Sequence, residues 1–165
     1  MITNDLVFDF NQQSNISKWV IVDDVVMGGK SFGSFSLNKS GHGEFTGDVS
    51  LENNGGFSSV RYRLNKDDIE NYSKFVLKIR GDGKAYQFRV KTNRYDYHSY
   101  IFTFQTTTEW QTIEVPFSEM YPAFRGRKLN MEKYQGKQLE EIAFLIGNKK
   151  NESFRLEIDR IELSL

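Results

Sequence analysis

The sequence predicts an all-β protein, built as a sandwich or a barrel. Apolar and polar residues alternate with a period of two along much of the chain, and clusters of Gly, Asn and Asp interrupt the alternation at short spacing. Aromatic residues make up 15% of the 165 residues, with 14 Phe and 8 Tyr against 2 Pro, which favours strands over disorder. Signals for helices are scarce. A chain of this length fits one domain, 1–165, and no linker, repeat or low-complexity tract divides it.

We expect about ten strands, each of which is an apolar or alternating run that ends at a turn-forming cluster. They cover 6–10, 19–22, 32–37, 43–51, 56–64, 74–80, 85–92, 99–106, 110–115, 141–147 and 153–164. Short helical turns are expected at 67–72 and at 117–120 or 137–141. The segment 116–136 contains both prolines and shows little periodicity, so it predicts a long surface loop.

The alternation also predicts which side chains enter the core, because successive residues of a strand point to opposite faces. The expected core faces are those of Phe75, Leu77 and Ile79, of Tyr86, Phe88 and Val90, and of Phe154, Leu156 and Ile158. In the last strand the apolar phase resumes one residue late, at Ile161, Leu163 and Leu165. This slip predicts a β-bulge near Asp159 and Arg160.

Charge and composition exclude several classes of function. Lys and Arg balance Asp and Glu at 22 each, so we expect no nucleic-acid partner. Without cysteine there is no disulfide, thiolate nucleophile or cysteine zinc site. No run of about 18 apolar residues exists, so we expect no membrane insertion. No export or transit signal is visible at the start, which makes a cytoplasmic location the default expectation.

The run 19–31 is the most informative local feature. An apolar strand is followed by two carboxylates, Asp23 and Asp24, and then by Gly28 and Gly29 before the next strand. Glycine permits a positive φ or a close approach to a ligand, and the carboxylates supply acceptors at the loop. We expect one carboxylate to accept backbone N–H bonds from the glycine turn, as Asp does in turns. Alternatively, the pair performs acid–base chemistry, which would make the chain a hydrolase that uses Asp23 or Asp24.

Other motifs lack the right spacing or context. The tripeptide at 29–31 resembles the end of a phosphate-binding loop, but a strand follows it rather than a helix. The two histidines, His42 and His98, are too few for a multi-histidine metal site. Asp9 and Asp159 could help to hold a structural calcium ion with backbone carbonyls, although two exposed or capped side chains are the simpler interpretation. We expect no other cofactor.

Positive charge is concentrated in the middle of the chain. Between Phe57 and Gln105, ten Lys or Arg residues stand against five Asp or Glu residues. Six of these cations occupy the polar phases of their strands: Arg61, Arg63, Lys78, Arg80, Arg89 and Lys91. If the strands adjoin, the cations form a basic face for an anionic ligand; if the strands alternate between two sheets, the patch is divided.

Several motifs occur in the order seen in a known family. They are Trp19, the Asp-Asp-Val-x-Met-Gly-Gly-x-Ser pattern at 23–31, the stretch from Phe45 to Arg61, and Arg-Gly-Asp-Gly-x-x-Tyr at 80–86. The chain resembles the complex I intermediate-associated protein family, the assembly-factor group of NADH:ubiquinone oxidoreductase, over nearly its whole length. This resemblance implies a galactose-binding-like jelly roll, which is an antiparallel β-sandwich related to carbohydrate-binding modules, with no enzymatic activity of its own.

The same resemblance implies a binding surface at a common rim, made by the two glycine-rich loops and nearby strand residues. Its expected members are Asp23, Asp24, Met27, Gly28, Gly29, Ser31, Asn53, Asn54, Gly55, Gly56, Arg61, Arg80, Asp82 and Tyr86. The leading hypothesis is a non-catalytic domain that binds a protein partner during assembly of a respiratory or another multi-subunit complex. The alternative is a carbohydrate-binding module that presents Tyr95, Tyr97 and Tyr121 to sugar rings.

Overall fold

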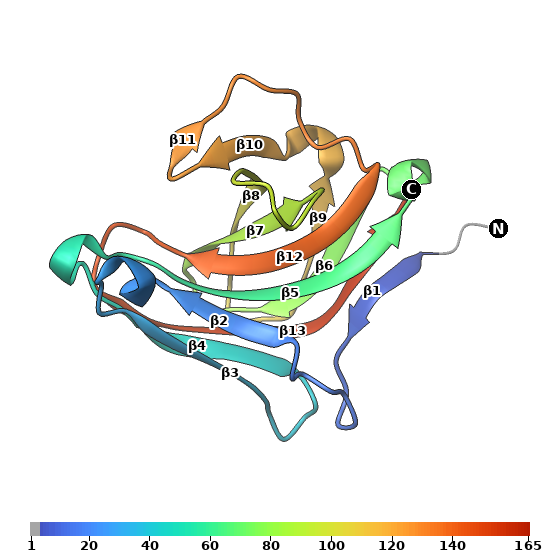
Figure 1. Ribbon diagram of the computed structural model, residues 1–165. Helices are drawn as coiled ribbons and strands as arrows, with labels where there is room; N and C mark the ends of the chain where they lie inside the picture. Colours follow the sequence, from blue (N-terminus) through green and yellow to red (C-terminus); the bar gives the residue numbers. More distant parts are fainter. Residues whose placement is uncertain (1–3) are drawn as a thin grey trace.

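The strands form two antiparallel sheets that pack face to face (Figure 1). The computed structural model describes residues 4–165, apart from the side chains of residues 26 and 27. The strands are β1 (Asp5–Asp9), β2 (Trp19–Asp23), β3 (Phe32–Leu37), β4 (Gly43–Val49), β5 (Ser58–Asp67), β6 (Lys74–Arg80), β7 (Ala85–Lys91), β8 (Ser99–Gln105), β9 (Gln111–Pro116), β10 (Tyr121–Phe124), β11 (Arg127–Lys128), β12 (Gln138–Ile146) and β13 (Glu152–Ser164). Four 3₁₀ turns accompany them: η1 (Asp24–Met27), η2 (Glu52–Asn54), η3 (Ile69–Asn71) and η4 (Phe117–Glu119). The predicted all-β antiparallel sandwich is confirmed.

The two sheets differ in size and in shape. Sheet A has the order β3-β4-β13-β6-β9, with β1 also paired to β13, and sheet B has the order β11-β10-β8-β7-β12-β5-β2. The backbone of sheet B curves, so that β10 and β11 lie across from β12 and β5, with β7 and β8 behind them (Figure 1). We call the concave outer face of this sheet the trough. Within residues 4–165, no helix is long and apolar enough to span a bilayer.

The predicted core faces are confirmed, because every residue named for them in β6, β7 and the first half of β13 is at most 4% exposed. The register of β13 against β6 shifts between Ile158 and Arg160, which confirms the predicted bulge. Ile161 and Leu163 return to the core beyond it. Leu165, the last residue of the apolar phase, is 52% exposed, because it follows the last residue of β13.

The segment 116–136 is not a continuous loop. It contains η4, then β10, which pairs with β8, and then β11, which pairs with β10. These strands of four and two residues are too short to show an alternation, and Pro122 interrupts the first. The predicted turns at 67–72 and 117–120 are confirmed by η3 and η4, whereas Gln138 begins a strand where the alternative turn at 137–141 was considered.

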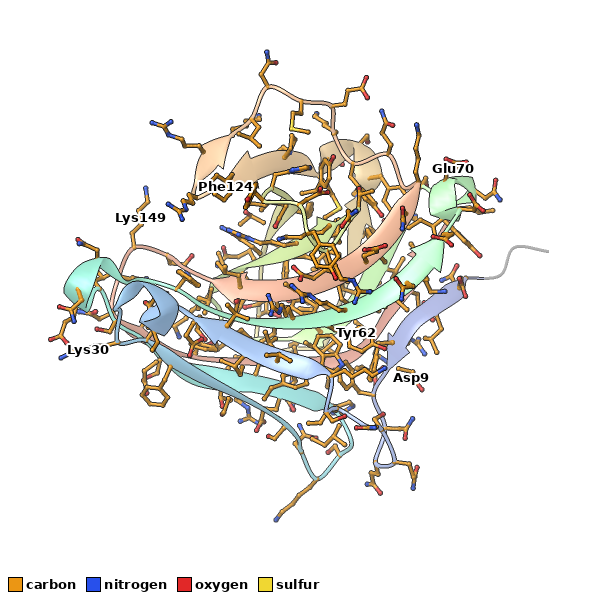
Figure 2. All side chains as sticks on the ribbon, in the orientation of Figure 1. Asp9, Lys30, Tyr62, Glu70, Phe124 and Lys149 are labelled. Carbon is orange, nitrogen blue, oxygen red and sulfur yellow. The ribbon has the colours of Figure 1, made fainter. Side chains whose placement is uncertain are left out.

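Five connections lie at the same end of the sandwich, because alternate strands run in opposite directions. They are the β2–β3, β4–β5, β6–β7, β8–β9 and β12–β13 connections. Figure 2 labels Lys30 and Lys149, which belong to two of these connections, at the left-hand end of the view. We call this end, with residues 24–31 and 50–57 as its centre, the glycine-rich end.

Candidate functional site

The two glycine-rich loops meet at the buried carboxylate of Asp24. Its Oδ1 accepts the backbone N–H of Ser31 at 2.9 Å, and its Oδ2 accepts the Ser31 hydroxyl at 2.6 Å. The same Oδ2 accepts the backbone N–H groups of Gly56 at 2.6 Å and Phe57 at 3.2 Å. Asp24 is 0% exposed, so this carboxylate holds the β2–β3 and β4–β5 connections together inside the protein.

Hydrogen bonding keeps the Asp24 carboxyl ionised. Burial by itself would raise the pKa of this group, but the Ser31 hydroxyl and the N–H groups of Gly56, Phe57 and Ser31 lower the pKa below its ordinary value of 3.8. Asp24 is thus a carboxylate that accepts backbone N–H bonds, as predicted, but the donors are Ser31 and two residues of the second loop rather than Gly28 or Gly29.

Asp23 is also a structural acceptor. Its carboxylate accepts the backbone N–H of Gly33 at 2.8 Å and the hydroxyl of Ser58, and only 9% of the residue is exposed. Ser58 and Ser50 were not among the expected site residues, although both lie in the motif stretch 45–61. The N–H of Ser50 donates to the Ser31 hydroxyl at 2.8 Å. Two signals were available: their place in that motif, and a serine at the strand end on each side of the second glycine-rich loop.

Two glycines of these loops, Gly29 and Gly55, are required by Asp24 itself. A Cβ at Gly29 would lie 2.5 Å from Asp24 Cγ, and a Cβ at Gly55 would lie 2.5 Å from Asp24 Oδ2. The backbone thus approaches an internal carboxylate closely. Asn53 and Asn54 are exposed at the tip of the second loop. The side chain of Met27 lies outside the described part of the structure, and Gly28 ends η1 with a φ of 89°.

The predicted site residues of the β6–β7 region are held within the fold. Tyr86 is 1% exposed, and its hydroxyl donates to Asp82 at 3.0 Å. Asp82 also accepts the backbone N–H of Arg155 at 2.8 Å, which ties the β6–β7 connection to β13. Arg80 donates from Nε to the buried Glu157 at 2.7 Å. The β6–β7 connection lies at the glycine-rich end, but the side chains of Arg80, Asp82 and Tyr86 bind other groups of the same protein.

Arg61 lies elsewhere, on the outer face of sheet B, which lines the trough. One row of paired residues crosses this face in the order Val20, Arg61, Ala143, Arg89, Ile101 and Tyr121. The neighbouring row contains Arg63, Glu141 and Lys91, and Arg63 donates to Glu141 at 3.1 Å. These two rows therefore place four cations and one carboxylate on the surface of the trough.

The predicted basic face is divided between the two sheets. Lys78 and Arg80 lie on β6 of sheet A, where Asp159 is 3.8 Å from the amine of Lys78 and Glu157 binds Arg80. The other four cations line the trough of sheet B. The patch that six cations would have made is thus reduced to four, because β6 and β7 follow each other in the sequence but belong to different sheets.

Asp9 and Asp159 do not fit a calcium ion. Pairing of β1 with β13 places them close together, and the N–H of Phe10 donates to the Asp159 carbonyl at 2.9 Å. The Asp159 carboxylate, however, lies 3.5 Å from Nε2 of His42 and 3.8 Å from the amine of Lys78. In the part of the chain that the structure describes, no group of three or more His, Cys, Asp or Glu side chains could hold a metal ion.

The three tyrosines considered as sugar platforms differ in accessibility. Tyr95 and Tyr97, in the β7–β8 connection, are 83% and 85% exposed, and the Tyr97 ring lies 6.0 Å from that of Phe124. Tyr121 belongs to the trough, and the amine of Lys128 lies 5.2 Å from the centre of its ring. Two of the three rings are therefore open to solvent.

This architecture is that of the β-sandwich carbohydrate-binding modules. The family 11 carbohydrate-binding module of the cellulosomal cellulase Lic26A-Cel5E of Clostridium thermocellum superposes with a TM-score of 0.73 and 17% identity, covering 99% of this chain and 95% of that one. A family 11 module from the same organism in complex with a β-1,3-1,4-mixed-linked tetrasaccharide has a TM-score of 0.70 and 18% identity, covering 99% and 96%. The predicted galactose-binding-like jelly roll is confirmed, and identities this low show the fold alone.

The sequence assigns the family. The profile of Complex I intermediate-associated protein 30 (CIA30) matches residues 8–158, so the chain belongs to the CIA30 family. Complex I intermediate-associated protein 30, mitochondrial, of Drosophila melanogaster is 28% identical over 187 residues, covering 96% of this chain and 62% of that protein. Its Mus musculus counterpart is 23% identical over 182 residues, covering 94% and 55%. The chain thus spans about three fifths of the length of these relatives.

Proposed function

We propose that this chain is a non-catalytic domain that binds a protein partner during the assembly of respiratory complex I. The observation that carries the proposal is membership of the CIA30 family across residues 8–158, because the relatives are named for their association with complex I intermediates. The geometry supports the absence of catalysis, since both carboxylates that a hydrolase would use, Asp23 and Asp24, are buried hydrogen-bond acceptors.

A cytoplasmic location stays a prediction. Both relatives carry the word mitochondrial in their names, and the proposal requires only that the chain meets complex I subunits in one compartment. Fractionation of the source cells, followed by immunodetection of the chain, tests the location independently of binding.

Affinity purification from the source cells tests the proposed function. The tagged chain, expressed at its natural level and cross-linked before lysis, is expected to enrich complex I subunits over a tag-only control. Deletion of the gene is expected to lower assembled complex I on native gels, while succinate dehydrogenase activity stays constant. No enrichment together with an unchanged amount of complex I would reject the proposal.

Carbohydrate binding is the second candidate function, and the high exposure of Tyr95 and Tyr97 favours it. Aromatic ring faces pack against the apolar faces of sugar rings. Native electrophoresis in a gel containing mixed-linked β-1,3-1,4-glucan provides the test. Retardation that Tyr97→Ala abolishes would support this function, and unretarded migration of the wild-type chain would reject it for this polysaccharide.

A further inference from the structure

Two arginines face the trough of sheet B with a small residue between them. Arg61 of β5 and Arg89 of β7 are both in register with Ala143 of β12, the strand that separates them. Adjacent strands lie about 4.8 Å apart, so the two arginines are separated by roughly 10 Å at their Cα atoms. Both side chains lie on the outer face of sheet B, which lines the trough, because they share one row with Ala143 on that face.

In the described part of the chain, neither arginine has a carboxylate partner. The acidic side chain in the neighbouring row, Glu141, is bound by Arg63. Among residues 4–165, no carboxylate lies within 4 Å of the guanidinium of Arg61 or Arg89, and Nε of Arg89 donates instead to the amide oxygen of Gln87 at 2.8 Å. Other arginines do have such a partner: Arg63, Arg80, Arg94, Arg155 and Arg160.

The Arg89 guanidinium is also partly removed from water. Burial lowers the pKa of Arg89, and the neighbouring Tyr121 opposes this only in part. A desolvated cation without a counter-charge gains more from an external anion than a fully hydrated cation does, because less water has to be displaced. The row therefore contains two guanidinium groups, and that of Arg89 has already lost part of the hydration that an anionic ligand would displace.

We infer that Arg61 and Arg89 form a carboxylate-binding site that takes an extended acidic segment of the partner protein. This inference rests on the proposed function and adds the chemistry that the partner must present. Each guanidinium offers a planar set of N–H donors that fits a carboxylate in bidentate fashion. Acidic side chains two residues apart lie on the same face of an extended segment and are separated by roughly 7 Å. Two long arginine side chains whose Cα atoms are roughly 10 Å apart can reach both of them.

A polypeptide fits this row better than an acidic polysaccharide does. Sugar binding relies on an open aromatic face, and the aromatic residue of the row, Tyr121, has the amine of Lys128 above its ring. The exposed Tyr95 and Tyr97 belong to the connection 92–98, outside the row. Lys91, in the next row, adds a further positive charge that suits a segment with several carboxylates.

The test measures binding of fluorescein-labelled hexaglutamate by fluorescence anisotropy at low salt. The proteins are the wild-type chain and the variants Arg61→Gln, Arg89→Gln and Arg160→Gln. Arg160 is the matched control, because it is an exposed arginine of sheet A whose charge is paired with Glu162 at 3.6 Å. Circular dichroism verifies that each variant is folded, and Arg61→Gln decides the question if Arg89→Gln does not fold.

We expect Arg61→Gln and Arg89→Gln each to weaken hexaglutamate binding about tenfold or more, since each removes a charge-assisted bidentate contact. Arg160→Gln is expected to change the affinity less than about twofold. An equal loss in Arg160→Gln, absence of binding by the wild-type chain, or tighter binding of hexagalacturonate than of hexaglutamate would overturn the inference.

This experiment and the affinity purification fail independently. If complex I subunits copurify but hexaglutamate does not bind, the inference is wrong and the proposed function stands. If hexaglutamate binds through Arg61 and Arg89 but no complex I subunit copurifies, the carboxylate site stands and the proposed function is wrong.

Discussion

Asp24 shows how one side chain can join loops that are distant in the sequence. Its type and its place beside glycines indicated a turn acceptor, because Asp accepts backbone N–H bonds readily in turns. Its donors in the second loop, Gly56 and Phe57, follow from the pairing of β2 with β5, which brings Asp23 opposite Ser58. No local pattern around Asp24 contains that information.

Replacing Asp24 with Asn should lower the free energy of unfolding by about 2–4 kcal/mol, because an amide nitrogen would face backbone N–H donors inside the protein. Urea denaturation at pH 7 measures the change. The matched control is Asp67→Asn, at an exposed position at the end of β5, which should alter stability by less than about 0.5 kcal/mol. A loss at Asp24 no larger than that of the control would show that its hydrogen bonds contribute little.

Asp24 should also contribute to acid sensitivity. Its pKa is lower in the folded protein than its ordinary value of 3.8, so the folded state favours the ionised form. The stabilisation is therefore complete above that value and is lost as the pH falls through the folded pKa. Urea denaturation between pH 7 and pH 2 should show a smaller loss of stability below pH 4 in Asp24→Asn than in the wild-type chain. If the stability of the two proteins fell in parallel with decreasing pH, the prediction would be wrong.

The packing of the β2–β3 and β4–β5 connections around Asp24 explains the glycines at positions 29 and 55. Gly29→Ala and Gly55→Ala should each cost about 2–3 kcal/mol of stability, because the new methyl group would overlap the Asp24 carboxylate. Gly83→Ala should cost only about 1 kcal/mol, since Gly83 has a φ of +85° but open space around it. Urea denaturation compares the three. Losses at Gly29 and Gly55 no larger than the loss at Gly83 would show that the Asp24 carboxylate moves to accommodate the methyl group.

The pairing of β6 with β13 assigns a structural role to Arg80, which the sequence analysis placed in a binding site. Arg80→Gln should lower stability by about 2 kcal/mol, because Glu157, which is 4% exposed, would lose its bonded cation. Thermal unfolding measures the loss, with Lys78→Gln on the same strand as a control expected to be nearly neutral. Hexaglutamate binding should be unchanged in Arg80→Gln. Reduced binding at full stability would instead indicate that Arg80 belongs to a binding site.

The elements that the sequence predicted well share one property. The alternation in β6, β7 and β13 covers six or more residues, so its period and even its one-residue slip are visible. The strands that it missed, β10 and β11, have four and two residues and exist because β8 offers an edge to pair with. Short strands are determined by their neighbours more than by their own residues.

The whole sandwich should unfold as one unit, which tests the prediction of a single domain over 1–165. Strands from both ends of the chain, β1 and β13, pair with each other, and the two sheets share one core. Trp19 is packed in that core, whereas Trp110 directly precedes β9 and lies beside Arg80. Urea transitions followed by tryptophan fluorescence and by far-ultraviolet circular dichroism should therefore coincide. Separate midpoints would indicate more than one folding unit.

By itself the sequence determined the all-β class, the core faces, the bulge in the last strand and the family, because alternation and motif order are properties of continuous segments. Only the tertiary structure decided which charged groups are already paired. Arg80 and Arg61 look alike along their strands, yet one lies beside Glu157 and the other beside Ala143. The neighbour across a sheet comes from a strand that is distant in the chain, and the order of strands in the two sheets selects it.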